Sequence, residues 1–506
     1  MKPSVLFLNP SPSLGLRGKS YVEACRVLQQ SHGCSVVLVA NGHPAREDLG
    51  FPMVNIEDWM QENADVIESA SLVELEKRHP KSNFWRGAVV ERSITDYSYM
   101  GSALPKSTYA IEEIEWYLKA TVLFYEEIIR KHNIDFAVNH VSDNIHSHIL
   151  YELSRSMDFT CVVPAWGGYW LIDRMYPVST AAYGSRLLTR RYRQYRNDYD
   201  TLVKPVLPEV MPHVDRIREK SAKQALPQTV VTRSLPVLLK RGVQAFWWRR
   251  GSFTMGKPDI HQSIYRSDLV RSAFKILPAK LYNRIGSQML ARQGNLPAEP
   301  FVFFPLHLIP EAMLLAVNPG WTDQLAVIRL LSASLPAGYR LVVKDHPLAG
   351  GSHVPGFYDA IHRLENVVLL PETMDSRSII KKAELIVTIG GTVGLEAMLL
   401  GIPAMILGQS FYSVMDTLLR PPQDINDMPY ALKDVLCNGR HPSAEDMEQD
   451  LQTFFAAWIS LMHPAGLANP FDQISEDTIP QAGQDWADAI FHMMTLLKDE
   501  KQPDDE

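Results

Sequence analysis

Hydrophobic residues in the first 180 positions alternate between short apolar runs, typical of buried strands, and longer segments with a helical period. The predicted strands cover 4–9, 35–40, 134–139 and 159–164. The predicted helices cover 19–30, 109–131 and 142–157, the last capped by Ser142 or Asp143. Strands separated by helices imply a parallel sheet covered on both faces.

The same alternation returns in the second half of the chain. Predicted strands cover 301–304, 340–344, 366–370, 385–389 and 404–407. Predicted helices between them cover 322–334, 376–383 and 393–400. We therefore expect an α/β protein with two doubly wound, Rossmann-like domains, which bind ligands at the carboxyl ends of their strands. The expected segments are 1–180, a basic helical insertion or linker at 181–295, a second domain at 296–425, and C-terminal helices with a polar tail at 426–506.

Charge is distributed unevenly along the chain. The whole chain carries −7, whereas residues 181–300 hold 22 Lys and Arg against 8 Asp and Glu. This segment also contains Trp247 and Trp248 beside Arg249 and Arg250, which suits an anionic membrane surface, a charged glycan or nucleic acid. A solvated helical face would have the same composition. Because no zinc-finger, RNA-recognition or helix-turn-helix signature accompanies it, we expect no nucleic-acid partner.

The composition of the 506 residues, 46% hydrophobic and 21% charged, is that of a globular protein. No apolar run approaches the roughly 20 residues that span a bilayer, and the chain start passes directly into a predicted strand. The cysteines show no metal-binding spacing and suit buried thiols in a reducing compartment. We expect a cytoplasmic protein without metal or cofactor. The four cysteines are Cys25, Cys34, Cys161 and Cys437.

A glycine-rich turn between a predicted strand and helix is the first candidate site. Gly390 and Gly391 permit positive φ and close approach of a ligand, and Thr392 can cap the helix. The amides of the first turn would then bind the phosphate of a nucleotide, with Glu396 one turn further along to accept hydrogen bonds from ribose hydroxyls. An ordinary turn of a doubly wound fold would need the same glycines and the same threonine.

A second cluster favours the phosphate-binding interpretation. Lys344, Asp345 and His346 follow a buried strand and precede Pro347, so they should lie at its carboxyl end. His346 could donate a hydrogen bond to a leaving phosphate, and Lys344 could supply positive charge. A lone histidine is more often structural, but this one precedes the glycine turn by about forty residues, a spacing that suits one site.

The order of these motifs resembles a known family. Residues 303–311, 342–347, 390–397 and 401–403 together are similar to the bacterial capsule polysaccharide biosynthesis family. That family includes two-domain glycosyltransferases of the GT-B type, some of which transfer Kdo from CMP-Kdo. The resemblance covers mainly 300–412, with a weaker echo at 143–174.

The resemblance implies roles for particular residues. His346 and Pro347 take the place of the His-Pro pair that contacts the nucleotide phosphate, and Thr392 with Gly391 takes the place of a Ser-Thr phosphate turn. Two positions depart from the family pattern, since Gly391 replaces a common serine and His307 replaces a common glutamine. The resemblance therefore leaves the sugar and the nucleotide base open.

The resemblance to GT-B enzymes also implies an acceptor side in the first domain. A carboxylate at a strand end could activate the acceptor hydroxyl, and Asp143 and Glu311 both fit. Asp143 would also serve as an ordinary carboxylate at a helix N-terminus. Gly15 and Gly18, between the first strand and the first helix, would admit the acceptor sugar closely.

Two further motifs are discounted. Residues 13–20 resemble a P-loop but have Ser13 where the first glycine is required, so ATP hydrolysis is not expected. Asp198 and Asp200 have the Asp-x-Asp spacing of metal-dependent glycosyltransferases but lie among arginines and tyrosines rather than at a strand end. No metal is required if the helix dipole, Lys344 and His346 offset the phosphate charge.

Together, the residues and the resemblance predict a metal-independent, membrane-peripheral GT-B glycosyltransferase. Its expected partners are a nucleotide-sugar donor, a capsule polysaccharide or glycolipid acceptor, and an anionic membrane surface. One alternative is a nucleotide-sugar epimerase of the same architecture. Another is a non-catalytic polysaccharide assembly protein that binds nucleotide or glycan without turnover.

Overall fold

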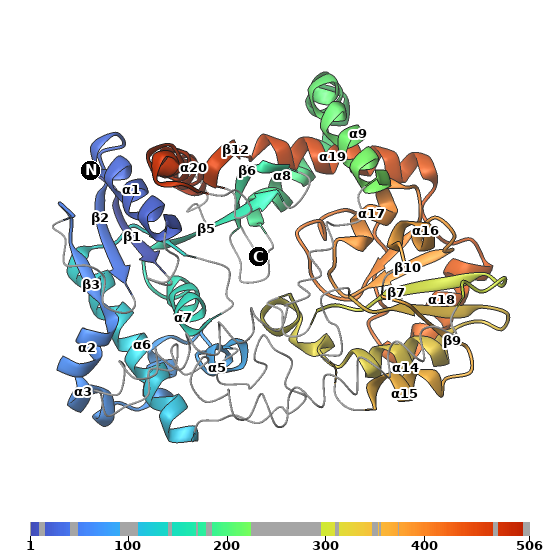
Figure 1. Ribbon diagram of the computed structural model, residues 1–506, viewed down its shortest axis with the longest axis horizontal. Coiled ribbons are helices and arrows are strands. Elements are labelled where there is room, and N and C mark those ends of the chain that lie inside the picture. The colour runs from blue at the N-terminus through green and yellow to red at the C-terminus, as the bar shows by residue number, and fades with distance from the viewer. Residues whose placement is uncertain are drawn as a thin grey trace, which may run out of the picture. The chain divides into compact units, whose positions relative to one another are not determined.

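The computed structural model divides into two compact units, each built around one β-sheet (Figure 1). Unit 1 comprises Met1–Val90, Tyr109–Val214 and Gln452–Glu506, and unit 2 comprises Glu91–Thr108 and Asp215–Leu451. The residues that the structure describes are 2–9, 16–40, 49–91, 110–139, 144–167, 171–178, 185–223, 295–308, 313–346, 353, 356–372, 374–468 and 474–498.

The sheet of unit 1 has seven strands in the order β12-β6-β5-β4-β1-β2-β3. Strands β3, β2, β1, β4 and β5 are parallel, β6 pairs antiparallel with β5, and β12 pairs antiparallel with β6. The direction of strand addition reverses between β1 and β4, as in Rossmann folds. The strands are β1 (Ser4–Asn9), β2 (Ser35–Ala40), β3 (Met53–Asn55), β4 (Phe136–Val138), β5 (Thr160–Gly167), β6 (Leu171–Val178) and β12 (His463–Pro464).

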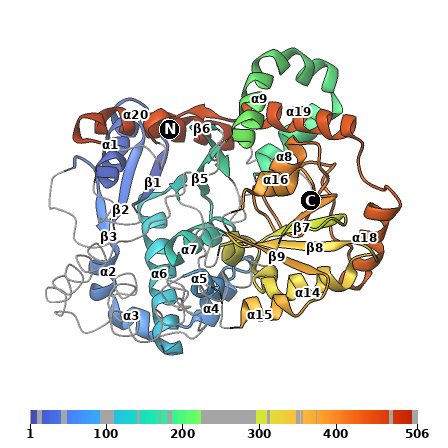
Figure 2. The same cartoon turned by 45° about the vertical axis from the view of Figure 1, so that its right-hand side comes forward.

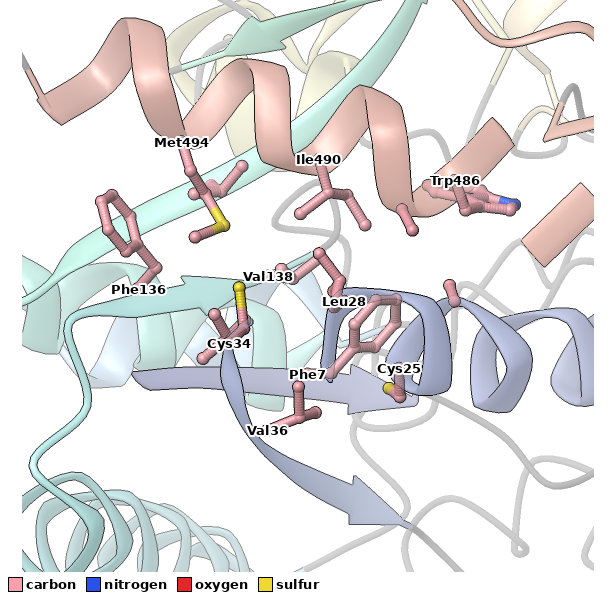
Figure 3. Packing of buried hydrophobic residues seen from close by; sticks show 14 of the residues in the cluster. Phe7, Cys25, Leu28, Cys34, Val36, Phe136, Val138, Trp486, Ile490 and Met494 are labelled. Atoms are coloured by element: carbon pink, nitrogen blue, oxygen red, sulfur yellow. The ribbon is translucent and has the colours of Figure 1, made fainter. Parts of the chain in front are cut away.

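Helices cover both faces of this sheet. Because side chains alternate along a strand, Val5 and Phe7 point to the face covered by α1 and α20, in a core that includes Leu28 and Ile490 (Figure 3). The helices of unit 1 are α1 (Leu16–Gln30), α2 (Ile56–Glu62), α3 (Ala64–Ser69), α4 (Leu72–Arg78), α5 (Trp85–Val90), α6 (Ile111–His132), α7 (Ile145–Ser154), α8 (Arg186–Asn197), the first half of α9 (Leu207–Lys223) and α20 (Ile479–Lys498).

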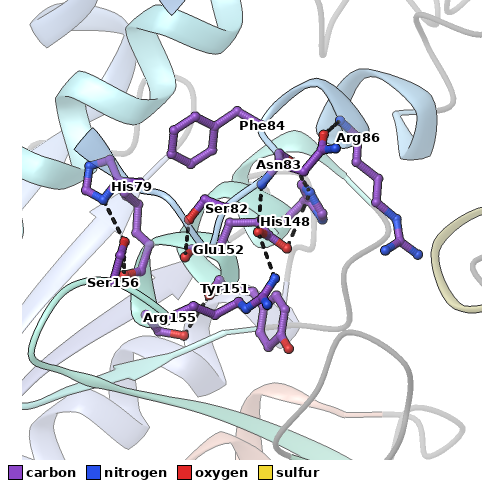
Figure 4. A network of polar contacts seen from close by, with 12 residues as sticks. His79, Ser82, Asn83, Phe84, Arg86, His148, Tyr151, Glu152, Arg155 and Ser156 are labelled. Carbon is purple, nitrogen blue, oxygen red and sulfur yellow. Dashed lines mark hydrogen bonds and ion pairs between the residues drawn. The ribbon is translucent and has the colours of Figure 1, made fainter. Parts of the chain in front are cut away.

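A buried polar network ties the segment between α4 and α5 to α6 and α7 (Figure 4). His79 Nε2 lies 2.6 Å from Glu126 Oε1. His148 Nε2 donates to the backbone carbonyl of Asn83 at 3.0 Å, and the Asn83 N–H donates to Glu152 Oε2 at 2.9 Å. These bonds satisfy polar groups that would be costly to bury alone.

The sheet of unit 2 has five strands, all parallel, in the order β11-β10-β7-β8-β9. Its first strand, β7, is again central, and the direction of addition reverses between β7 and β10. The carboxyl ends of these two strands therefore meet at the switch point, where doubly wound folds bind ligands. The strands are β7 (Phe301–Pro305), β8 (Arg340–Lys344), β9 (Val367–Leu370), β10 (Leu385–Thr388) and β11 (Ala404–Ile406).

Helices α14 and α15 cover one face of this sheet, and α16 and α17 cover the other (Figure 2). Val302 and Phe304 point toward the first face, where they pack with Ile328 and Leu331 of α14. The helices are α14 (Gln324–Ser334), α15 (Phe357–His362), α16 (Ser376–Ile380), α17 (Val393–Leu399), α18 (Met428–Cys437) and α19 (Ala444–Ser460).

The predicted α/β architecture with two Rossmann-like domains is confirmed, and several boundaries are corrected. Helix α1 begins at Leu16, three residues earlier than predicted. Asn144, rather than Ser142 or Asp143, caps α7 by accepting from the Ser147 N–H at 2.9 Å.

The structure describes part of the predicted segment 181–295 and assigns the helices of the predicted segment 426–506 to different units. Residues 185–223 are helical as expected, whereas 224–294, including Trp247 and Trp248, lie outside the described residues. Of the C-terminal helices, α18 packs on α14 in unit 2 and α20 packs on α1 in unit 1.

All four cysteines are free thiols, but Cys437 is exposed rather than buried. In the described part of the chain, no helix combines the length and apolarity that crossing a membrane requires.

Candidate functional site

The switch point of unit 2 brings together the two clusters that were predicted from sequence. Strand β7 pairs with both β8 and β10, so the residues after all three strands reach the same edge of the sheet. The Leu306 N–H, just beyond β7, donates to the backbone carbonyl of Lys344 at 2.9 Å. On the other side, the Gly390 N–H donates to Nε2 of His307 at 3.3 Å.

Lys344 is a buried cation at the end of β8. The residue is 4% exposed, and among the described residues its Nζ makes one long hydrogen bond, 3.5 Å, to the carbonyl of Asp345. Burial lowers the pKa of Lys344, and the carboxylates of Asp345, Glu372 and Asp375 oppose that shift. An ammonium with three donors and one weak acceptor is suited to receive an anionic ligand.

Asp345 is held rigidly beside it. Its carboxylate accepts from the backbone N–H of His346 at 2.7 Å, from His353 Nε2 at 3.1 Å and from the Tyr358 hydroxyl at 2.5 Å. Burial would raise the pKa of Asp345, but the His353 charge and these hydrogen bonds outweigh it and lower the pKa. Asp345 therefore remains an anion that fixes the backbone at His346.

His346 is half-buried at the end of β8. Burial lowers its pKa, the Asp345 carboxylate opposes the shift, and Lys344 reinforces it. A neutral imidazole still carries one N–H and can donate a hydrogen bond without adding charge.

The glycine turn differs from its predicted form. Neither Gly390 nor Gly391 has a positive φ. Their N–H groups already donate within the protein, Gly390 to His307 and Gly391 to Thr388 Oγ1 at 3.2 Å. Fewer backbone amides than predicted can therefore bind a phosphate, because the N–H groups of Gly390 and Gly391 form hydrogen bonds within the protein.

Thr392 and Glu396 interact with each other rather than with the start of α17. Thr392 occupies the N-cap position but makes no side-chain cap bond, and its hydroxyl donates to Glu396 Oε1 at 3.2 Å. Burial raises the pKa of Glu396, while Thr392 and Arg377 oppose the rise and Asp375 adds to it. The predicted capping role of Thr392 is therefore wrong. Gly401, just past the end of α17, has a φ of 75°.

Three residues of this site were not predicted from sequence as parts of it. Tyr412 donates its hydroxyl to the carbonyl of Gly391 at 2.5 Å, and Gln324 binds both backbone polar groups of His307. Tyr412 and Gln324 lie far from these partners along the chain, so periodicity and motif spacing carry no signal for them. For His307 the sequence offered one indication, because this histidine stands where glutamine is common in the family pattern.

Several predicted residues lie elsewhere or outside the described residues. Gly18 is in the first turn of α1 rather than in a loop. Asp200 forms a surface ion pair with Lys204 at 2.5 Å. Within the described ranges, no group of three or more His, Cys, Asp or Glu side chains is arranged to hold a metal ion. The candidates outside the described residues are Gly15, Asp143, Glu311 and Pro347.

Comparison with known proteins gives one clear result. Residues 300–416 match the family described as capsule polysaccharide biosynthesis protein. This segment runs from β7 through β11 and includes the described residues of the switch-point site. The resemblance to the capsule biosynthesis family that was inferred from the motifs is therefore confirmed for this segment of the chain.

Similar solved structures have low sequence identity. A glycosyltransferase from Rickettsia africae ESF-5 is 9% identical, covering 97% of this chain and 99% of that chain, with a TM-score of 0.29. The KpsC β-Kdo 2,7 transferase from Thermosulfurimonas dismutans is 13% identical, covering 69% and 97%, with a TM-score of 0.30. A UDP-GlcNAc 2-epimerase from Neisseria meningitidis bound to UDP-GlcNAc is 10% identical, covering 91% and 98%, with a TM-score of 0.27. No curated protein sequence matches the chain significantly.

Proposed function

We propose that this protein is a metal-independent GT-B glycosyltransferase that transfers a sugar from a nucleotide donor to a capsule polysaccharide or another surface polysaccharide or glycolipid. The observation that carries the proposal is the buried Lys344 ammonium at the switch point of a capsule biosynthesis segment. A buried ammonium with only one weak hydrogen bond among the described residues would bind an anion such as a nucleotide phosphate.

In the proposed donor complex, Lys344 offsets the phosphate charge and His346 donates a hydrogen bond to the leaving phosphate. Charge develops on that phosphate as the glycosidic bond breaks, so donors fixed in advance stabilise the transition state more than the bound substrate. Thr392 and Glu396, already joined by a hydrogen bond, are placed to bind the ribose hydroxyls. Gly390, Gly391 and Pro347 shape the backbone around the phosphate.

Unit 1 would bind the acceptor. Asp143 and Glu311 remain our candidates for the carboxylate that takes the acceptor proton, with Gly15 and Gly18 near the acceptor sugar. Asp143 follows β4, which pairs with β1 at the switch point of unit 1. Kdo supplied by CMP-Kdo is one donor that fits a capsule biosynthesis segment.

The basic segment at 181–295 would bring the enzyme to an anionic membrane surface. Its described part includes α8, where Arg186, Arg190, Arg193 and Arg196 are exposed. Lysine and arginine near an anionic surface each contribute about 1 kcal/mol. Flotation with phosphatidylglycerol vesicles should recover the protein, and equal recovery with neutral vesicles would contradict this part of the proposal.

Calorimetric titration with CMP, UDP and GDP tests donor binding directly. We expect one of the three to bind the wild-type protein in the presence of EDTA. Product analysis with the matching nucleotide sugar then separates the activities, because transfer requires an acceptor whereas epimerisation does not. A protein that binds none of the three nucleotides would contradict the proposal, and binding without any turnover would favour the non-catalytic assembly protein.

A further inference from the structure

The imidazole of His307 lies between β7 and β10 at the switch point of unit 2. Its Nε2 accepts a hydrogen bond from the Gly390 N–H at 3.3 Å. Its backbone is fixed by Gln324, whose Oε1 accepts from the His307 N–H at 2.7 Å and whose Nε2 donates to the His307 carbonyl at 3.0 Å. His307 therefore has a defined position and a defined ring orientation.

This contact determines which ring nitrogen carries the proton. A backbone N–H can only donate, so Nε2 must present its lone pair to Gly390. Burial, reinforced by the charge of His346, lowers the pKa of His307 to about 4, so the ring is neutral at pH 7. In a neutral imidazole whose Nε2 accepts, the proton is on Nδ1.

Among the residues that the structure describes, that Nδ1–H group has no hydrogen-bond partner. His307 is 7% exposed, and its Nδ1 is a buried polar atom without a partner. Leaving a buried donor unpaired is unfavourable, so an unpaired N–H group of this kind requires an explanation. A ligand that supplies an acceptor oxygen would recover that energy.

The surroundings of His307 indicate the chemistry of this oxygen. Leu306, the preceding residue, is hydrogen-bonded to Lys344, and His346 is close enough to influence the His307 ring electrostatically. Gly391 lies on the other side, where a Cβ atom would be 3.0 Å from Nε2. An anion held between Lys344 and the glycine turn would therefore have His307 beside it.

We propose that His307 is a specificity-determining residue whose Nδ1–H donates a hydrogen bond to a phosphate oxygen of the nucleotide donor. This inference rests on the proposed function, because it places the nucleotide phosphate at the switch point. His307 recognises an acceptor oxygen without adding charge, whereas Lys344 supplies the charge. The glycine turn and His307 are thus one unit, in which Gly390 orients the ring and the ring contacts the ligand.

Two substitutions separate the contact with the phosphate from the contact with Gly390. His307→Leu removes both ring nitrogens, whereas His307→Gln keeps an amide oxygen for the Gly390 N–H and an amide N–H for the phosphate. Titrations use CMP, UDP and GDP, with cytidine, uridine and guanosine as probes that lack the phosphate. His362→Leu, at an exposed position on α15, is the matched control.

For the nucleotide that binds the wild type, we expect His307→Leu to weaken binding roughly 10- to 100-fold, the loss of one hydrogen bond to a charged group. Binding of the corresponding nucleoside should be unchanged, and His307→Gln should retain most of the nucleotide affinity. The ¹⁵N shifts of histidine-labelled protein should show the Nδ1–H form of His307 at pH 7 and a change at Nδ1 when the nucleotide is added.

The outcomes separate the two proposals. If wild-type protein binds neither CMP nor UDP nor GDP, the proposed function fails and this inference fails with it. If the wild type binds but folded His307→Leu binds equally well, or loses nucleoside and nucleotide affinity alike, the inference is overturned while the proposed function stands. If His307→Leu does not fold, the ¹⁵N spectra of the wild type decide. The inference is overturned if His307 carries its proton on Nε2, or if the nucleotide leaves the Nδ1 shift unchanged.

Discussion

The hydroxyl of Tyr412 occupies the space that a side chain at Gly394 would need. The same hydroxyl donates to the carbonyl of Gly391 at 2.5 Å, so Tyr412 packs under the turn and fixes it. Gly394 has no positive φ, so its backbone conformation does not require glycine. The close approach of Tyr412 does require it. Tyr412 and Gly394 thus hold the turn that carries Thr392 and Glu396.

Gly394→Ala should lower stability by about 1–2 kcal/mol, because the overlap with Tyr412 outweighs the better helix propensity of alanine. Tyr412→Phe should also destabilise, through the lost hydrogen bond to Gly391. The double variant should lose less stability than the sum of the two single variants, because phenylalanine leaves room for the new methyl group. Urea unfolding of all three variants measures this coupling, and simple additivity would show that the two residues do not share this space.

Lys344→Met should separate binding from stability. Replacing a buried charge that makes only a weak hydrogen bond with an apolar side chain should leave the thermal midpoint unchanged or higher. Nucleotide affinity should fall roughly tenfold or more, because the phosphate loses its nearest cation. Thermal scanning and calorimetry measure the two effects, with Lys382→Met at an exposed position as control. A variant that is less stable yet binds CMP or UDP as well as wild type would argue for a purely structural lysine.

His148 should make unit 1 sensitive to acid. Burial lowers its pKa to about 4, with Arg86 and Arg155 adding to the shift and the hydrogen bond to Asn83 opposing it (Figure 4). The folded protein then keeps His148 neutral, whereas the unfolded chain binds a proton below about pH 6.5. Its contribution to stability is complete above pH 6.5 and is lost as the pH falls toward 4.

His148→Gln should therefore flatten the pH dependence of unfolding, because glutamine keeps a donor for the Asn83 carbonyl but does not titrate. Between pH 7.5 and pH 5, wild type should lose about 2 kcal/mol more than the variant. Glu152, whose pKa is raised by burial, is present in both proteins and its effect largely cancels. The exposed His441→Gln variant should behave as wild type. Identical slopes for wild type and His148→Gln would refute the assignment.

The contact between α1 and α20 should depend on Gly483. A Cβ atom there would lie 2.6 Å from Cβ and Cγ of Glu23 and 3.1 Å from the backbone nitrogen of Ala24. Gly483→Ala should therefore destabilise unit 1 by about 1 kcal/mol or more, although alanine favours helix formation. Gly320→Ala, which would meet no atom within 4 Å, should be neutral. Thermal unfolding compares the two, and equal midpoints would mean that α20 can shift at no cost.

The amino-acid sequence determines most of the secondary structure and the succession of strands and helices along the chain. Each strand of unit 2 was visible as a short apolar run, because a parallel strand is buried on both faces. The location of Lys344 and His346 at a strand end also follows from local pattern. These properties depend on neighbouring residues, whose periodicity is directly readable.

The partners of the site residues were decided by tertiary structure. Gly390 and Gly391 were expected to offer their amides to a ligand, but His307 and Thr388 accept those N–H groups. Likewise, α20 completes the core of unit 1 with α1, although hundreds of residues separate them. A local pattern specifies which groups are apolar or polar, but contacts between distant segments arise only when the sheet brings strand ends together and each buried group takes the partner that then lies within reach.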